Sequence, residues 1–103
     1  METRHRVATG DARELDGIGD DAVELVVTSP PYPMIDMWDD VFADLDPAVG
    51  DAVAAGDGAA AFELMHSVLD DAWAEVARVL VDGGIACVNV GDATRSLDGS
   101  FRV

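Results

Sequence analysis

The strongest constraint on the fold comes from a proline-rich segment that follows an apolar run. Residues Val23–Thr28 are rich in β-branched side chains and nearly continuous in apolar character, which predicts a strand covered on both faces. Ser29-Pro30-Pro31-Tyr32-Pro33 follows directly. Proline cannot donate to a strand ladder, and it pushes the preceding residue towards extended geometry. The strand is therefore expected to end in a stiff loop at its C-terminal edge.

A long helix and a second strand are expected downstream. Residues 59–80 carry apolar side chains at three- and four-residue spacing, and Gly83-Gly84 is expected to stop this helix. Residues 85–90 then predict a second buried strand. The order strand, loop, long helix, strand predicts a right-handed crossover in a parallel sheet, and so an α/β fold. The apolar stripe of the helix consists of Phe62, Met65, Leu69, Trp73, Val76 and Leu80.

The remaining segments carry weaker signals. Residues 6–9 predict a short strand and residues 11–15 a helical turn that Asp11 could cap. A short helix is expected around residues 38–45. Residues 47–58 indicate a connecting loop with helical pieces.

Composition indicates one small acidic domain. The 103 residues carry 21 acidic side chains against six arginines and no lysine, for a net charge of −15. The acids are dispersed, which favours a surface adapted to concentrated salt over an interaction tail. An ordinary acidic protein and a DNA-mimicking inhibitor are the alternatives. No stretch predicts a signal peptide or a membrane span, so a cytoplasmic protein without membrane contact is expected.

Polar residues cluster at the predicted strand ends. Gly10-Asp11, Ser29-Pro30-Pro31-Tyr32 and Gly91-Asp92 each follow a predicted strand. Ligands of open parallel sheets bind outside the carboxyl ends of the strands. These clusters are therefore the expected functional site.

Ser29-Pro30-Pro31-Tyr32 resembles motif IV of the DNA amino-methyltransferases, and its serine form resembles the cytosine-N4 branch. Residues 26–39 also resemble haloarchaeal members of this family. The resemblance implies S-adenosylmethionine as cofactor and double-stranded DNA with a flipped cytosine as partner. It further implies that the Pro30 carbonyl and the Ser29 hydroxyl accept hydrogen bonds from the base amine, while Tyr32 stacks on the base. A proline-rich strand terminator is the alternative interpretation.

The other strand ends have less specific counterparts in the family. Asp11 resembles the acidic residue that hydrogen-bonds the cofactor adenine amine, although a helix cap explains it equally well. Asn89 and Asp92 resemble the later motif that borders the target pocket, and a plain turn is the alternative.

Several residues of reactive types are expected to have structural roles and no catalytic one. Cys87 is expected to be a small core residue, because a cytosine-C5 nucleophile would need a Pro-Cys loop. His66 is expected to have a surface or packing role on the long helix. Asp36, Asp39 and Asp40 are interpreted as a solvated face, and no metal site is expected. Met34, Met37 and Trp38 fit either the pocket or the core.

The resemblance also identifies what is missing. Family members hold the cofactor with a Phe-x-Gly-x-Gly loop, which does not occur in this sequence. Only 28 residues precede Ser29, so the permuted, β-type order is the one that fits, with that loop and the target-recognition domain downstream. Residues 1–103 are therefore expected to form one partial class I, Rossmann-like methyltransferase domain, truncated C-terminally. Activity would require a second polypeptide.

Three functions remain open at this point. The first is a fragment of a cytosine-N4 DNA methyltransferase. The second is methylation of adenine-N6, RNA or a protein amide in the same pocket. The third is a non-catalytic acidic binding module.

Overall fold

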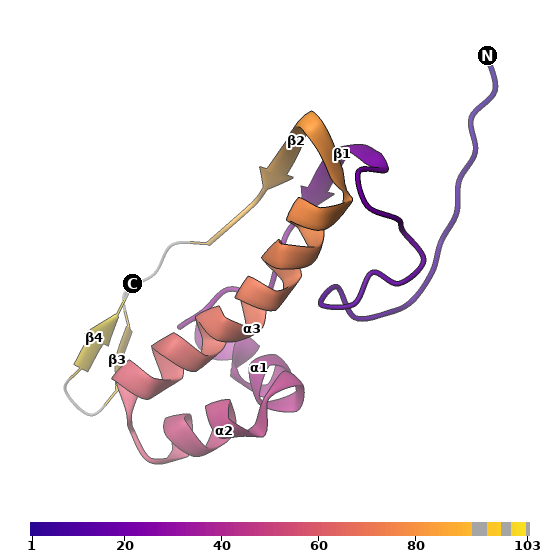
Figure 1. Cartoon of the computed structure of the whole chain (residues 1–103). Coiled ribbons are helices and arrows are strands. Elements are labelled where there is room, and N and C mark those ends of the chain that lie inside the picture. The colour runs from indigo at the N-terminus through magenta and orange to yellow at the C-terminus, as the bar shows by residue number, and fades with distance from the viewer. Residues whose placement is uncertain (92–94, 98–99, 103) are drawn as a thin grey trace.

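The chain forms an elongated α/β structure around one long helix (Figure 1). The computed structural model describes residues 1–91, 95–97 and 100–102, with extents of 55 × 22 × 22 Å. Strand β1 (Val23–Thr28) pairs in parallel with β2 (Leu80–Val88), and β3 (Arg95–Leu97) pairs antiparallel with β4 (Ser100–Arg102). The parallel pairing confirms the predicted α/β class. In chain order the elements are β1 (Val23–Thr28), the 3-10 turn η1 (Asp36–Trp38), α1 (Asp39–Leu45), α2 (Pro47–Ala54), α3 (Gly58–Val79), β2 (Leu80–Val88), β3 (Arg95–Leu97) and β4 (Ser100–Arg102).

Helix α3 agrees with the predicted helix to within one residue at each end. The Asp57 carboxylate caps its first turn by accepting a hydrogen bond from the Ala60 amide at 3.0 Å. The helix ends where Leu80 turns extended, with φ −70° and ψ 136°, and the chain enters β2 at that residue. The connection between helix and strand therefore contains no loop.

The prediction that Gly83 and Gly84 stop the long helix is wrong, because both glycines lie inside β2. The pairing with β1 shifts register between Leu80 and Ile85, so the strand bulges at this point. Gly83 has a φ of +79°, which glycine adopts without strain. A Cβ on Gly84 would lie 2.9 Å from the Val81 carbonyl oxygen. The two glycines thus allow the bulge.

The buried core lies among the three helices, and the sheet contributes little to it. Met65, Val68 and Leu69 on α3 pack against α1, α2 and the turn before η1. The apolar face of α3 is therefore buried against other elements of this chain. The core cluster consists of Met34, Phe42, Val49, Ala52, Ala61, Met65, Val68 and Leu69.

The strands are not covered on both faces, which contradicts the expectation from their composition. Val27 is 73% exposed and Ile85 61% exposed, and Leu25 and Val88 are also exposed. Cys87, expected in the core, is exposed as well. Strand side chains alternate between two faces, and the helices of this chain do not enclose both of them. The apolar run therefore predicted the strands correctly and their burial wrongly.

The expected strand at residues 6–9 is also wrong. Residues 1–22 are all described and contain no strand. An isolated strand cannot satisfy its backbone donors and acceptors without a neighbour, and this segment lies exposed. Residues 11–14 form one turn, closed by a hydrogen bond from the Glu14 amide to the Asp11 carbonyl at 3.0 Å.

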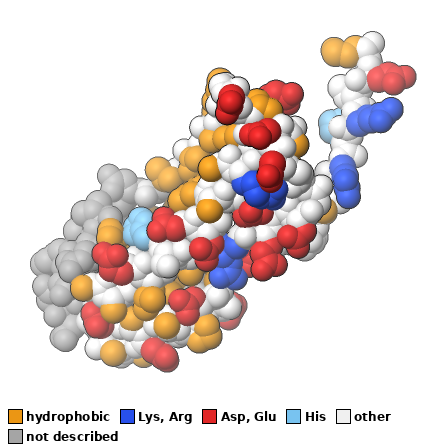
Figure 2. Space-filling view, viewed as in Figure 1, with side chains coloured by type: hydrophobic (Ala, Val, Ile, Leu, Met, Phe, Trp, Pro, Cys, Tyr) orange, Lys and Arg blue, Asp and Glu red, His pale blue; other side chains and the backbone are white. Residues whose placement is uncertain are grey.

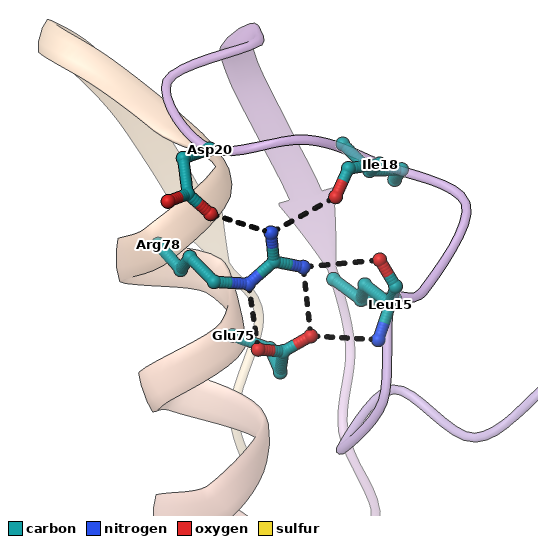
Figure 3. A network of polar contacts seen from close by, with 5 residues as sticks. All are labelled: Leu15, Ile18, Asp20, Glu75 and Arg78. Atoms are coloured by element: carbon teal, nitrogen blue, oxygen red, sulfur yellow. Dashed lines mark hydrogen bonds and ion pairs between the residues drawn. The ribbon is translucent and has the colours of Figure 1, made fainter.

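Arg78 ties the loop before β1 to the end of α3 (Figure 3). Its guanidinium donates to both Glu75 carboxylate oxygens, to Asp20 at 2.8 Å and to the carbonyls of Leu15 and Ile18. The Leu15 amide in turn donates to Glu75 at 2.7 Å. A guanidinium suits this geometry because it presents five donors in one plane. The network fixes the approach of the chain to β1.

No helix in the part of the chain that the structure describes is long and apolar enough to cross a membrane.

The network makes a prediction about acid stability. Hydrogen bonds from Arg78 and then from Leu15 lower the pKa of Glu75 from 4.5 to about 2. A lowered pKa in the folded state stabilises the fold above pH 4.5, and this contribution is lost as pH falls towards 2. Glu75→Gln should therefore lower the thermal midpoint near neutral pH, and its difference from wild type should shrink across that interval.

Glu63→Gln provides the control, because Glu63 is exposed on the same helix. Its midpoint should follow wild type at every pH. A Glu75→Gln difference that stays constant down to pH 2 would contradict the assigned role of the charge.

Candidate functional site

The ends of β1 and β2 bring the predicted site residues to one edge of the sheet. Ser29 follows β1 and Asn89 follows β2. Thr28 is paired with Val88, and the Asn89 amide donates to the Thr28 carbonyl at 2.9 Å. The two strands are parallel, so their carboxyl ends meet. The structure thus places Ser29 beside Asn89, although 60 positions separate them in the chain.

The Tyr32 hydroxyl connects the two strand ends. It lies 2.8 Å from the Ser29 Oγ, and the Asn89 side-chain amide donates to it at 3.3 Å. Ser29 and Asn89 are exposed, whereas Tyr32 is half-buried. The site therefore presents two hydroxyls and an amide on a surface that solvent and ligands can reach.

The Tyr32 ring packs between apolar and backbone groups. It meets the Trp38 ring edge-on, with centroids 6.0 Å apart and an interplanar angle of 72°. Gly91 approaches the ring so closely that a Cβ there would lie 2.7 Å from the Tyr32 Cδ2. Trp38, which the sequence left undecided, belongs both to the surroundings of Tyr32 and to the margin of the core.

A strained turn follows the proline pair. The Ile35 amide donates to the Tyr32 carbonyl at 3.4 Å, which closes a turn with Pro33 and Met34 at its centre. Met34 has a φ of +65°, a conformation that favours glycine. Its side chain is 1% exposed, and its amide donates to the Met65 sulfur at 3.4 Å. Burial of Met34 thus holds the loop in a strained conformation next to Tyr32.

A cleft of about 640 Å³ connects Ser29 with Asp11. Volumes of this size are typical of small-molecule sites. The cleft lies between β1, α3 and the loop that precedes β1, and apolar side chains form most of its wall. Its lining includes Gly10, Asp11, Ser29, Pro30 and Pro31 from the predicted site and Val41, Val68, Ala72, Trp73 and Val76 from the helices.

Asp11 lines this cleft, although no strand precedes it. Its carboxylate is already paired with Arg13. The Arg13 side chain and backbone amide donate to both carboxylate oxygens, with the ion pair at 2.8 Å. These hydrogen bonds, the side-chain ones first, lower the pKa of Asp11. Arg13 also donates to the Leu45 carbonyl at 3.3 Å, which links the loop to α1. No local pattern in the sequence predicts the role of Arg13, because its pairing with Asp11 depends on how the loop turns.

The other candidates have simple explanations or lie elsewhere. His66 packs against Phe62 with ring centroids 4.5 Å apart and the rings tilted by 52°, which confirms a packing role. Among the described residues, no group of three or more His, Cys, Asp or Glu side chains is arranged to hold a metal ion. Asp92 lies outside the described residues.

Comparison with known proteins relates the whole chain to part of two methyltransferases. It is 46% identical over 114 aligned residues to the Type II methyltransferase M.MjaI of Methanocaldococcus jannaschii, of which it covers 38%. It is 38% identical over 104 residues to the Type II methyltransferase M.MthZI of Methanothermobacter thermautotrophicus, of which it covers 29%. The chain thus spans well under half the length of these curated relatives. No protein-family model matches it, and no solved structure does.

These similarities support the methyltransferase resemblance that the Ser-Pro-Pro-Tyr segment suggested. The matched region includes all of the candidate site, since both alignments cover 100% of the chain. The relatives' names do not specify which atom is methylated. The cytosine-N4 assignment and the salt-loving source therefore stay predictions.

The strained turn makes a prediction about stability. Met34→Ala removes a buried side chain but keeps a Cβ at positive φ, and should cost roughly 2–5 kcal/mol of unfolding free energy. Met34→Gly removes the same side chain and also relieves the backbone. It should be more stable than Met34→Ala by about 1 kcal/mol. Denaturant unfolding of both variants measures the difference.

The reverse order, with alanine more stable than glycine, would show that the positive φ of Met34 carries no strain. Met37→Ala and Met37→Gly provide the matched pair, because Met37 is 74% exposed and lies in η1. There glycine should be the less stable of the two.

Proposed function

We propose that this chain carries the target-base pocket of an S-adenosylmethionine-dependent DNA methyltransferase that modifies the N4 amine of cytosine. The observation that carries the proposal is the meeting of Ser29, Tyr32 and Asn89 where β1 and β2 end, beside a cleft that also contains Asp11. The similarity to two Type II methyltransferases over the whole chain supports it.

The chemistry of an aromatic amine explains the residue types. The lone pair of the cytosine N4 amine is delocalised into the ring, so the nitrogen is a weak nucleophile. Acceptors for both amine hydrogens favour a pyramidal and more nucleophilic nitrogen. We assign these roles to the Ser29 Oγ and the Pro30 carbonyl, with Pro31 fixing the loop that presents them. Tyr32 stacks on the cytosine once it has left the duplex.

The cofactor, when bound, supplies an activated methyl group for direct displacement. The methyl group would pass to the amine nitrogen with the cofactor's thioether as the leaving group, and the amine proton would go to solvent water. This chain contributes positioning to that step, which dominates when two reactants are held in line. No side chain has to form a covalent bond to the base.

Asp11 fits the adenine end of the cofactor only after a rearrangement. Arg13 donates four hydrogen bonds to the two carboxylate oxygens, which uses their acceptor positions. Asp11 becomes available to the adenine amine when Arg13 turns away. The guanidinium already donates to the Leu45 carbonyl at 3.3 Å, and this contact would hold Arg13 near α1 after it leaves Asp11.

The charge of the chain requires that DNA contacts come from elsewhere. Figure 2 shows acidic side chains spread over the visible face, and the net charge is −15. Two of the six arginines, Arg13 and Arg78, are held by carboxylates of the chain itself. Phosphate binding depends on basic groups. We propose that residues 1–103 act as a partial catalytic domain in the cytoplasm. The glycine-rich cofactor loop and the DNA-recognition surface then belong to a further polypeptide segment.

A chimera tests the proposed reaction. Residues 1–103 replace the matching segment of M.MjaI, and nucleosides of the exposed DNA are then analysed by mass spectrometry. N4-methylcytosine is expected. Ser29→Ala in the chimera should lower the rate on the order of 10²-fold, as removal of one preorganised hydrogen-bonding group does in other active sites.

Ser67→Ala is the matched control, because Ser67 is exposed on α3, and it should leave the rate unchanged. If the product is N6-methyladenine, the target base is adenine and the cytosine-N4 proposal is wrong. Methylated RNA or protein amide would move it to another substrate class. A folded chimera without any methylation would favour the acidic binding module.

Cofactor affinity of the chain alone makes a second test. Because Arg13 occupies Asp11, and the sequence holds no Phe-x-Gly-x-Gly loop, isothermal titration with S-adenosylmethionine in molar KCl should give no saturable heat. Circular dichroism must first show that the chain is folded in that buffer. Saturable binding by the folded chain would mean that residues 1–103 build the cofactor site unaided.

A further inference from the structure

We propose that Asn89 and Gly91 are positioning residues that set the Tyr32 ring and, through its hydroxyl, the hydrogen-bonding state of Ser29. The proposal rests on the proposed function in one respect, namely that Tyr32 and Ser29 receive the base. Tyr32 lies in a loop after β1, whereas Asn89 and Gly91 lie after β2. The position of the ring is therefore set by the neighbouring strand and not by its own loop alone.

Asn89 has a defined place because the sheet holds its backbone. Its amide donates to the Thr28 carbonyl at 2.9 Å, which continues the pairing of the strands by one residue. Its side-chain amide then donates to the Tyr32 hydroxyl oxygen at 3.3 Å. Because the Asn89 Nδ2 group donates and does not accept, the hydrogen of the Tyr32 hydroxyl remains available for another acceptor.

The nearest such acceptor is Ser29. Its Oγ lies 2.8 Å from the Tyr32 hydroxyl, a normal length for a hydrogen bond between hydroxyls. With the phenol as donor, the order runs from Asn89 through Tyr32 to Ser29. Ser29 then keeps its own hydrogen, and one oxygen lone pair, for a ligand. Asn89 thus acts on Ser29 without touching it.

Gly91 sets the ring itself. A Cβ at this position would lie 2.7 Å from the Tyr32 Cδ2, closer than real Cβ atoms come, and 3.0 Å from its Cε2, which is a tight contact. The same Cβ would lie 3.0 Å from the Ile35 Cδ1, so the ring and its turn would have to move together. The missing side chain of Gly91 lets the ring rest against the end of β2 while Trp38 meets it edge-on.

The test uses the fact that Tyr32 is the chain's single tyrosine. Selective ¹³C labelling of tyrosine gives one Cζ signal, which reports hydrogen bonding of the hydroxyl, and one set of ring signals, which reports packing near Trp38. Asn89→Ala should shift the Cζ signal towards its value in the urea-denatured chain. Gly91→Ala should shift the ring signals and leave the far-UV circular dichroism of α3 in place.

Val90→Ala is the control between them, because Val90 is 65% exposed, and it should move neither set of signals. An unchanged Cζ signal in Asn89→Ala, or unchanged ring signals in Gly91→Ala, would overturn the assignment to that residue. If Gly91→Ala loses thermal stability, the same substitution should cost much less in a Tyr32→Ala background, and an equal cost in both backgrounds would also overturn the proposal.

The measurement needs neither DNA nor a methyl donor. Failure of the chimera to methylate leaves these shifts unaffected, so the two proposals fail separately.

Discussion

The parallel pairing of β1 with β2 is the contact on which the candidate site depends. Five paired positions hold Val23–Thr28 against Leu80–Val88, and the pairing ends where the polar residues begin. Ser29 and Asn89 become neighbours only because the two strands run in the same direction and stop together. The long helix α3 makes this possible, since a parallel partner requires the chain to return across the length of the sheet. The bulge at Gly83 and Gly84 absorbs the register change without moving the strand ends apart.

Most of the fold follows from patterns in the sequence. The β1 strand and helix α3 were predicted almost residue by residue, because a β-branched run and a three-to-four spacing are local signals. The short helix α1 was expected near Trp38. Helix α2 forms where a connecting loop with helical pieces was expected: Asp46 caps it and Pro47 occupies its first turn. The wrong predictions, which concern one strand and the burial of strand residues, share one cause. Residues 6–9 lack a partner strand, and Val27, Ile85 and Cys87 lack a covering layer. Strand burial depends on neighbours that no local pattern specifies.

The site shows the same division between local and non-local information. The stiffness of the Pro30-Pro31 loop and the polar residues after each strand could be derived from the chain. The pairing of Asp11 with Arg13, the approach of Gly91 to Tyr32 and the positive φ of Met34 could not. Each of these depends on the three-dimensional path of a loop. Met34 shows the reason clearly, since a buried methionine is a good core residue and a poor residue for its backbone conformation.

Electrostatics bears on the proposed role of this acidic chain in DNA methylation. A surface with a net charge of −15 repels phosphate at low salt, but at about 1 M salt the Debye length falls to ~3 Å. Charges on the far side of the domain are then screened from the site, while groups in contact with a base are not. The site itself has this character: Ser29, Tyr32 and Asn89 are neutral, and the carboxylate of Asp11 is neutralised by Arg13. In the proposed reaction a base amine would therefore meet neutral acceptors, which suits a reaction that depends on positioning and not on proton transfer from a charged group.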